Sequence, residues 1–348
     1  MPMHTYLTII VPSIIAFVIT IVATLFMMRY MYESGVTATD YNKKNRPTLP
    51  SSMGLAVAFG FGIGMLTYIF GSSFNFYVPV ASLEYLFATI LAVLLVSLVG
   101  FIDDINVKTK LTKTTGMMDT RVGLKQWQKP LLTLMGAIPL MAINAGVSIV
   151  TIPFIGAVPF GIFYPLIIVP LAIIFAANAF NLLGGFNGIS TGTGLIAALG
   201  MVAYSILFGT YTGLLISSIL VAVFLAIFIF DFYPSRILPG DSFTYFAGTA
   251  LVATMIIGNM ESFGIIIFMP WIIEFFLHLR KKFDVTDLGK RQNDGTFKSP
   301  YGRQIYSWTH IAMNVIKKPK EWEVSVFMFG VEALFVFLAL GLKLVHLL

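Results

Sequence analysis

The sequence predicts an all-α polytopic membrane protein with about ten transmembrane helices, whose polar groups of chemical interest gather on the cytoplasmic face. Composition is the first reason. Hydrophobic residues make up 57% of the chain and charged residues only 11%, whereas a soluble domain carries roughly 25% charged residues. The mean hydropathy of +0.88 agrees with this. The second reason is the length of the apolar stretches, because a helix needs about 20 apolar residues to cross a bilayer.

Ten apolar stretches follow one another along the chain. The first has neither a basic start nor a small-residue cleavage site, so we expect it to be a retained span and not a signal peptide. Glycine and proline interrupt the fourth to seventh stretches, which helices inside a membrane tolerate. The predicted spans are 5–29, 51–72, 82–101, 129–147, 161–182, 190–208, 211–231, 242–258, 262–279 and 323–345. We expect a single domain over 1–348, with a long cytoplasmic loop at 281–322 before the last helix.

The distribution of basic residues orients these spans. The odd-numbered connections carry nearly all of them: Lys43, Lys44 and Arg46; Lys108, Lys110, Lys113, Arg121 and Lys125; Arg236; and the segment from Arg280 to Lys320. The even-numbered connections, near 73–81, 148–160, 209–210 and 259–261, hold no Lys or Arg. By the positive-inside rule the odd connections are cytoplasmic and both termini lie outside. The protein is thus expected in the cell membrane, or in the endoplasmic reticulum of a eukaryote.

The same asymmetry explains the net charge of +6. Nucleic acid is not an expected partner, because no basic face is interleaved with exposed aromatic residues. The chain contains no cysteine. Disulfides and thiolate metal sites are therefore excluded, and the redox compartment cannot be inferred from cysteine usage.

Polar clusters fall where apolar stretches end on the cytoplasmic face. Asp103 and Asp104 directly follow the uncharged run 85–101, and Asn181 and Asp241 also lie where apolar runs stop. Adjacent acids at a helix end are more often a solvated cap than a site. Ionisable groups at the edge of hydrocarbon are costly, however, and three acids together with one amide on one face favour function. Carboxylates at a membrane face suggest a site for a divalent cation and a phosphate.

Several motifs resemble the polyprenyl-phosphate N-acetylhexosamine-1-phosphate transferase family, glycosyltransferase family 4. They are FIDDIN at 101–106, NAFNLLGGFNG at 178–188 and FYPSRILPGDSFTYFAG at 232–248, and the resemblance runs from about Asp40 to Ile273. The second and third motifs are similar to the eukaryotic dolichyl-phosphate N-acetylglucosamine phosphotransferase. The bacterial branch has an Asp where this chain has Gly184, and a histidine-rich motif that is missing here. An archaeal or eukaryotic type is therefore favoured, and we expect an archaeal source.

The resemblance implies a reaction and a cofactor. N-acetylglucosamine-1-phosphate would pass from UDP-N-acetylglucosamine to a polyprenyl (dolichyl) phosphate, releasing UMP and starting lipid-linked oligosaccharide synthesis for protein N-glycosylation. The family pattern makes Asn181 and Asp241 the ligands of Mg²⁺, with Mn²⁺ as an alternative. Asp103 and Asp104 are assigned to catalysis, without fixing which acid takes a proton. Lys129 matches a family lysine that holds a phosphate.

Substrate contacts are also implied by the resemblance. Asn187 stands at the family's uridine-contacting asparagine, and Asp40 opens the first polar cluster on the same face. Leu238 replaces an aromatic residue of the eukaryotic pattern, which weakens a ring stack on uracil. The last cytoplasmic loop lacks the eukaryotic Pro-Arg-His-Arg sequence, so Lys290 and Arg291 are its basic candidates.

Other interpretations remain open at this stage. A different UDP-hexosamine could be the donor, for a cell-envelope glycan. A membrane transporter would also place charged groups among many spans, although usually near the bilayer midplane. A non-catalytic lipid-binding scaffold would need only the basic loops. The expected partners are the sugar nucleotide, the polyprenyl phosphate and membrane lipid, and a homodimer is among the assemblies that the sequence allows.

Overall fold

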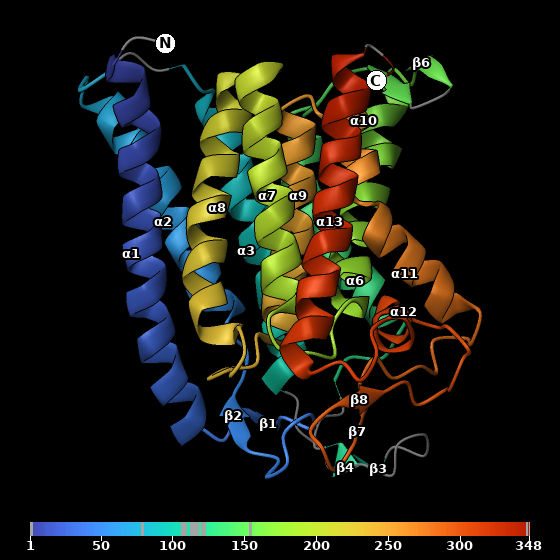
Figure 1. The fold of residues 1–348 in the computed structure, drawn as a ribbon. Coiled ribbons are helices and arrows are strands. Elements are labelled where there is room, and N and C mark those ends of the chain that lie inside the picture. The colour runs from blue at the N-terminus through green and yellow to red at the C-terminus, as the bar shows by residue number, and fades with distance from the viewer. Residues whose placement is uncertain are drawn as a thin grey trace.

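The computed structural model describes residues 3–77, 80–105, 110–111, 118–119, 123–152, 155–345 and 347. Upright helices form the body of the molecule (Figure 1). The long helices are α1 (Met3–Glu33), α2 (Gly54–Ser73), α3 (Leu83–Ile105), α6 (Val169–Leu182), α7 (Ile189–Leu207), α8 (Tyr211–Asp231), α9 (Gly240–Ile257) and α13 (Glu321–Leu344). The shorter ones are α4 (Gln128–Thr133), η1 (Leu134–Gly136), α5 (Ile138–Ala142), η2 (Tyr164–Ile168), α10 (Glu261–Ile267), α11 (Met269–Leu279) and α12 (Trp308–Val315).

Within the described residues, seven helices are long and apolar enough to cross a membrane, or eight if α10 and α11 form one bent span. The polytopic helical prediction is therefore confirmed. The predicted fourth span is divided into α4, η1 and α5, and the predicted ninth is bent by 50° between α10 and α11. Proline explains both breaks, because Pro139 and Pro270 lack the N–H that a continuous helix needs and crowd the preceding turn, so that new helices begin with these residues in their first turn.

Four two-stranded antiparallel sheets depart from the all-α prediction. They pair β1 (Thr37–Thr39) with β2 (Thr48–Pro50), β3 (Lys110–Leu111) with β4 (Met118–Asp119), β5 (Ile149–Ile152) with β6 (Gly156–Pro159), and β7 (Lys290–Arg291) with β8 (Phe297–Lys298). Each strand has two to four residues. Such strands are too short to reveal the period-2 pattern by which a sequence predicts strands.

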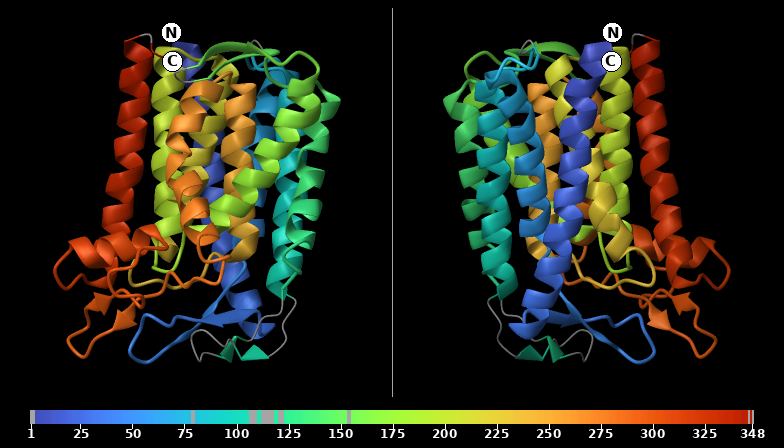
Figure 2. Two further views of the ribbon diagram at one scale, coloured as in Figure 1. Left: turned by 90° about the vertical axis from the view of Figure 1, so that its right-hand side faces the viewer. Right: turned by 90° about the vertical axis from the view of Figure 1, so that its left-hand side faces the viewer.

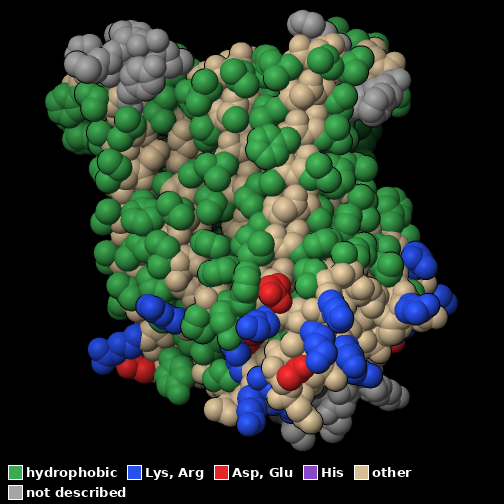
Figure 3. All heavy atoms as spheres, in the orientation of Figure 1, with side chains coloured by type: hydrophobic (Ala, Val, Ile, Leu, Met, Phe, Trp, Pro, Cys, Tyr) green, Lys and Arg blue, Asp and Glu red, His purple; other side chains and the backbone are tan. Residues whose placement is uncertain are grey.

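The two ends of the helix bundle differ in charge. Both termini lie at one end (Figure 1), and Lys and Arg gather at the opposite end (Figure 3). The hairpins β1–β2, β3–β4 and β7–β8 extend beyond that second end, as both views in Figure 2 show. We call it the basic end. Lys108, Lys113 and Arg121 of the predicted basic loops lie outside the described residues.

Helix α9 is the central element, with nearly all of its residues buried. Two glycines allow the chain to crowd around its first turn. A side chain at Gly100 of α3 would meet the backbone carbonyl oxygen of Asp241 at 2.5 Å. Gly240 has a φ of +78° and lies so close to Asp104 that a Cβ would be 2.5 Å from its carboxylate. Small residues at a helix interface permit such close approach inside a membrane, and here they bring α3 against the start of α9.

Candidate active site

The two adjacent acids at the end of α3 are both buried and make different contacts. Asp104 accepts hydrogen bonds from the backbone N–H groups of Asp241 and Ser242, at 2.9 and 3.0 Å. It therefore caps the first turn of α9, where backbone N–H groups have no partner within the helix. Asp103 accepts a hydrogen bond from the backbone of Leu124 and forms an ion pair with Lys129. Asp104 thus positions α9, whereas Asp103 belongs to a charged cluster.

That cluster is centred on Lys129 in α4. Its ammonium lies 2.6 Å from a carboxylate oxygen of Asp103 and 3.1 Å from one of Asp241. Three N–H donors on one ammonium allow it to serve both acids at once. The cluster carries one excess negative charge when both acids are ionised. Residues from three separate segments of the chain therefore meet as the sequence predicts.

Asn181, at the end of α6, lies beside the same first turn of α9. Its side-chain carbonyl oxygen accepts a hydrogen bond of 2.9 Å from the Thr244 hydroxyl. That hydroxyl is also 3.2 Å from the backbone carbonyl of Asp241. The contact fixes which way the amide of Asn181 points, and a second lone pair on its oxygen stays available.

A cavity of about 300 Å³ opens beside these residues at the basic end. Asn181 and Asp241 line it together with the predicted substrate residues Asp40, Asn187 and Leu238. The amide nitrogen of Asn187 donates to a carboxylate oxygen of Asp40 at 3.0 Å, and both side chains are buried. Leu238 forms part of the wall and hydrogen-bonds through its backbone N–H to Pro50. We call this the polar cavity.

A second cavity, of about 850 Å³, lies on the other side of Asn181. Lys129 and Asn181 are among its polar residues, and the remaining wall is largely apolar. Phe175 lines both this cavity and a third, almost wholly apolar one of about 340 Å³. The second and third cavities follow α6 and the bent pair α10–α11 away from the basic end. We call them together the apolar groove.

Two predicted residues lie elsewhere. Lys290 and Arg291 are exposed on the hairpin β7–β8, and neither lines the polar cavity. Arg291 instead shares a separate recess of about 430 Å³ with Lys43, Lys44 and Arg46. From the same loop, Leu288 is the residue that reaches the polar cavity. A basic cluster in a sequence does not reveal which part of its loop folds inward.

One further acid of the polar cavity is not among the residues predicted from the sequence. Asp231 ends α8, is buried, and accepts a hydrogen bond of 2.7 Å from the Thr191 hydroxyl. It ends an uncharged apolar run, as Asp103 does, so the same pattern identifies it. Glu321, at the start of α13, forms an ion pair of 2.5 Å with Lys43 beside this cavity. That contact joins segments 278 residues apart, and local sequence carries no signal for it.

Comparison with known proteins decides the family. The model of glycosyl transferase family 4 matches residues 86–259, which include Asp103, Lys129, Asn181 and Asp241. The chain belongs to glycosyl transferase family 4. It is a polyprenyl-phosphate hexosamine-1-phosphate transferase embedded in a membrane, and the resemblance found in the sequence is confirmed.

Full-length relatives agree with this assignment. A protein of Saccharolobus solfataricus is 32% identical over 97% of each chain and is provisionally named UDP-N-acetylglucosamine–dolichyl-phosphate N-acetylglucosaminephosphotransferase. A protein of Sulfolobus acidocaldarius with the same provisional name is 32% identical over 96% of this chain and 95% of its own. The phospho-N-acetylmuramoyl-pentapeptide-transferase of Halalkalibacterium halodurans is 30% identical over 70% of each chain.

Proposed function

We propose that the enzyme transfers N-acetylglucosamine-1-phosphate from UDP-N-acetylglucosamine to a polyprenyl (dolichyl) phosphate, releasing UMP and starting lipid-linked oligosaccharide synthesis for protein N-glycosylation. The names of the two archaeal relatives support this donor and this acceptor. One observation carries the proposal. The ion pair between Lys129 and Asp241 joins a residue of the apolar groove to a residue of the polar cavity. A lipid-borne phosphate and a sugar nucleotide would meet there.

The polar cavity suits the nucleotide. Asn187 donates a hydrogen bond from its amide nitrogen to Asp40. Its side-chain carbonyl oxygen does not take part in that contact and is suited to accept a hydrogen bond from the uracil ring. Leu238 offers an apolar surface for the base on the same wall. Asp40 holds Asn187 in place through one carboxylate oxygen, and its other carboxylate oxygen accepts a hydrogen bond of 3.1 Å from the backbone N–H of Asn42.

The apolar groove suits the polyprenyl chain. Its walls are formed by α6 and α11, so an isoprenoid can enter from the side without leaving the hydrocarbon layer. Lys129 lies in the polar part of the groove and would bind the lipid phosphate as a point charge. The ion pair with Asp103 holds the ammonium in position for this contact.

In the proposed reaction, an oxygen of the lipid phosphate attacks the sugar-bearing phosphorus of the nucleotide. A new P–O bond forms, and the bond from that phosphorus to the oxygen bridging it to UMP breaks, with the electron pair leaving on UMP. Positioning and charge neutralisation are the main demands on the protein. A phosphate has its second pKa near 6. Asp103 therefore needs to accept a proton only from the fraction of lipid phosphate that is still protonated.

Asn181 and Asp241 fit Mg²⁺ by their chemistry. Both line the polar cavity, and they offer an amide oxygen and a carboxylate oxygen, the hard ligands that this ion prefers. When bound, Mg²⁺ supplies positive charge to the pyrophosphate of the nucleotide. Asp104 contributes by fixing the first turn of α9, and with it the backbone of Asp241. Mn²⁺ is the expected substitute.

We also propose that ten segments cross the membrane. They are the eight selected by length and hydropathy, together with α9 and the broken segment from Gln128 to Ala142. The shared position of the two termini and the crowding of Lys and Arg at the opposite end support an outside location for both termini (Figures 1 and 3). The active site then faces the cytoplasm.

The test is to incubate the purified protein with UDP-N-acetylglucosamine, a polyprenyl phosphate and Mg²⁺ and to measure UMP and lipid-linked sugar. Both products are expected only when all three are present. A preference for another UDP-hexosamine would move the function toward a cell-envelope glycan, as the bacterial relative suggests. If no UDP-hexosamine yields UMP, the transferase proposal fails and transport becomes the alternative.

A further inference from the structure

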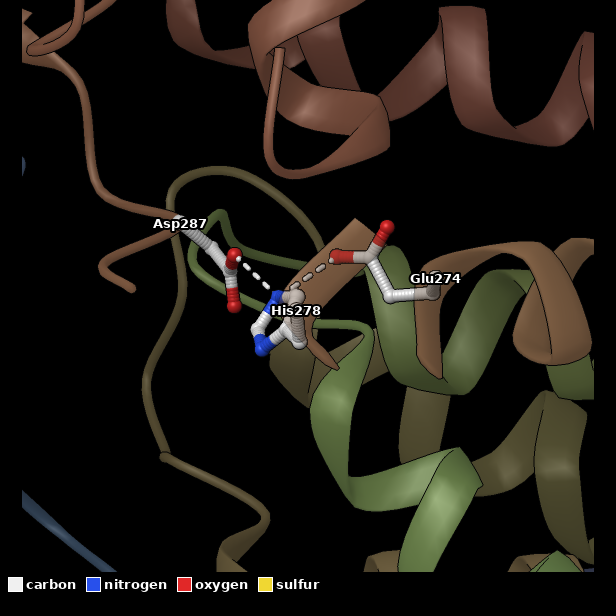
Figure 4. A group of neighbouring side chains, drawn as sticks. All are labelled: Glu274, His278 and Asp287. Atoms are coloured by element: carbon white, nitrogen blue, oxygen red, sulfur yellow. Dashed lines mark hydrogen bonds and ion pairs between the residues drawn. The ribbon is translucent and has the colours of Figure 1, made fainter. Parts of the chain in front are cut away.

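A second cluster of titratable side chains lies outside the residues used so far. Glu274 and His278 are on α11, and Asp287 is in the loop that follows it (Figure 4). The Nε2 atom of His278 is 3.1 Å from a carboxylate oxygen of Glu274 and 3.1 Å from one of Asp287. Glu274 is fully buried, His278 is nearly so, and the Asp287 side chain is 16% exposed.

Both carboxylates converge on a single ring nitrogen. That nitrogen carries at most one hydrogen, so it can donate one well-directed hydrogen bond to one of the two carboxylates. The other carboxylate oxygen then receives no well-directed hydrogen bond from the histidine. A bound metal ion, by contrast, can interact with all of these atoms at once, because it needs several ligand atoms directed toward one point. The three ligand atoms lie within 4.8 Å of one another. Ligand atoms bound at about 2.0 Å in a tetrahedral zinc site are separated by roughly 3.3 Å.

The charge of the cluster also favours a cation. When ionised, the two carboxylates carry two negative charges, and the shared His278 can supply at most one positive charge, so a cation would neutralise the cluster. Among the residues that the structure describes, no Lys or Arg forms a salt bridge with Glu274 or Asp287. The neighbouring His310 uses both ring nitrogens on backbone groups. Its Nδ1 accepts a hydrogen bond from the backbone of Tyr306, which leaves Nε2 to donate to the backbone carbonyl of Thr286.

The spacing of the ligands and the hydrogen bonds that hold them are typical of a metal-binding site. Glu274 and His278 are four residues apart on one helix, the spacing by which paired helical ligands share a zinc ion. The second oxygen of Glu274 accepts a hydrogen bond of 2.9 Å from the backbone of Trp308. Thr309 donates to the backbone carbonyl of Asp287 at 3.0 Å. Such outer contacts orient metal ligands, and α12 supplies both of them.

We propose that Glu274, His278 and Asp287 bind a divalent transition-metal ion, with Zn²⁺ as the ion to test, and that this ion fastens the loop after α11 to the helix. One imidazole and two carboxylates suit Zn²⁺, whereas Mg²⁺ prefers oxygen ligands alone. The site is therefore separate from the proposed Mg²⁺ site and does not depend on the transferase function.

Fastening this loop would hold one wall of the polar cavity. Asp287 lies so close to the backbone at Gly185 that a side chain there would meet it at 2.7 Å. The next residue, Leu288, lines the polar cavity, as does Gly185. The backbone carbonyl of Gly185 in turn accepts a hydrogen bond of 2.5 Å from Asn42. The ion would thus stabilise a wall of the cavity without touching the nucleotide.

The test measures metal binding by the full-length protein. After dialysis into metal-free buffer, wild-type protein should bind about one Zn²⁺ per chain in calorimetry, and Zn²⁺ should raise its melting temperature. Glu274→Gln and His278→Gln should each weaken binding by at least roughly a hundredfold. Asp294→Asn removes an exposed carboxylate from the same loop and should bind as wild type does. Asp241→Asn should also bind normally, because it belongs to the other site.

Two outcomes would overturn the proposal. One is the absence of any Zn²⁺ binding by wild-type protein, and the other is equal binding by Glu274→Gln, His278→Gln and wild type. If the variants fail to fold, Co²⁺ added to wild-type protein decides the question. Visible absorption bands of tetrahedral Co²⁺ that Zn²⁺ abolishes are expected. Their absence would contradict the proposal, and the lack of cysteine rules out thiolate binding as their source.

Discussion

Lys129 lies between Asp103 and Asp241, and His278 lies between Glu274 and Asp287, so both clusters place a basic side chain between two acids. The surroundings differ. The Lys129 cluster opens to solvent-accessible space, with Asp241 28% exposed and next to two cavities, whereas Glu274 is fully enclosed. A lysine ammonium stays charged and can donate hydrogen bonds to several acids. One histidine nitrogen can donate to one acid or bind one metal ion. The first cluster thus suits the proposed anionic substrates, and the second suits the proposed metal ion.

The largest effect that would test this comparison is expected for Asp241→Asn. This change deletes the only formal charge that the protein would give the Mg²⁺ ion, so turnover should fall by several orders of magnitude and the Mg²⁺ requirement should rise. UMP release across a series of Mg²⁺ concentrations measures both, with Asp294→Asn as a control carboxylate. The melting temperature should change little. Ordinary activity at low Mg²⁺ would instead make Asp103 and Asp104 the likelier ligands.

Asp103→Asn and Asp104→Asn should each lower turnover by at least roughly a hundredfold, the range for groups that transfer protons or organise charge. They should differ in stability. Only Asp104 accepts from two N–H groups of α9, one on each carboxylate oxygen, and Asn keeps one acceptor oxygen, so Asp104→Asn should lose one hydrogen bond and about 0.5–1.5 kcal/mol of the free energy of unfolding. Thermal unfolding in detergent, paired with the UMP assay, separates the two roles. If both variants were nearly as active as wild type, the acid pair would be no more than a helix cap.

Lys129→Met should lower turnover roughly 10- to 100-fold while leaving Mg²⁺ binding intact or tighter. The reason is that Asp241 loses its ion-pair partner and becomes available to the metal, whereas the lipid phosphate loses a cation. Turnover at varied Mg²⁺ and varied polyprenyl phosphate checks this. A weakened Mg²⁺ dependence together with an unchanged KM for the lipid would contradict the role given to Lys129.

Asn187→Ala should raise the KM for UDP-N-acetylglucosamine by roughly tenfold and change kcat much less. One hydrogen bond contributes about 0.5–1.5 kcal/mol, and Asn187 would contact the uracil away from the reacting phosphates. Steady-state kinetics with the nucleotide varied measure the change. A fall in kcat with an unchanged KM would place Asn187 at the reaction centre and not at the base.

The smallest effect on activity is expected from a change that tests orientation. The chain has no cysteine, so Asn293→Cys at the exposed tip of the β7–β8 hairpin gives a single thiol. It should react with a membrane-impermeant reagent only from the cytoplasmic side. Ile155→Cys, in the exposed turn between β5 and β6 at the other end, is the matched control and should react from outside. Labelling of Asn293→Cys in intact cells would reverse the proposed topology.

The two clusters also differ in how far the sequence predicts them. Asp103, Asn181 and Asp241 each end an apolar run, so hydropathy alone locates them at one membrane face. Glu274 and His278 lie within or beside a predicted span, and the partner Asp287 is in a loop whose path no local pattern reveals. For the same reason the sequence does not predict that Leu288, and not Lys290 or Arg291, is the residue of this loop that lines the polar cavity. Tertiary contact decides these positions.

The different contacts of Asp103 and Asp104 also depend on tertiary structure. The sequence indicates that the pair matters but not which acid does what, because the answer depends on how α3 meets the first turn of α9. The polytopic helical character is predictable because bilayer thickness imposes a minimum length on apolar helices, and seven or eight of the ten predicted spans meet that length among the described residues. A criterion based on the length of apolar stretches detects neither helix breaks at proline nor hairpins whose strands have two to four residues.

The position of Asn181 on the walls of both the polar cavity and the apolar groove has a consequence for inhibitor design. Because the two spaces share Asn181 as a lining residue, a short linker is expected to join a nucleoside-like head to an alkyl tail. In such a molecule the second half would bind at a high effective concentration once the first is in place. A two-headed ligand of this kind would compete with both substrates simultaneously, and resistance would require changes at residues that the reaction itself needs.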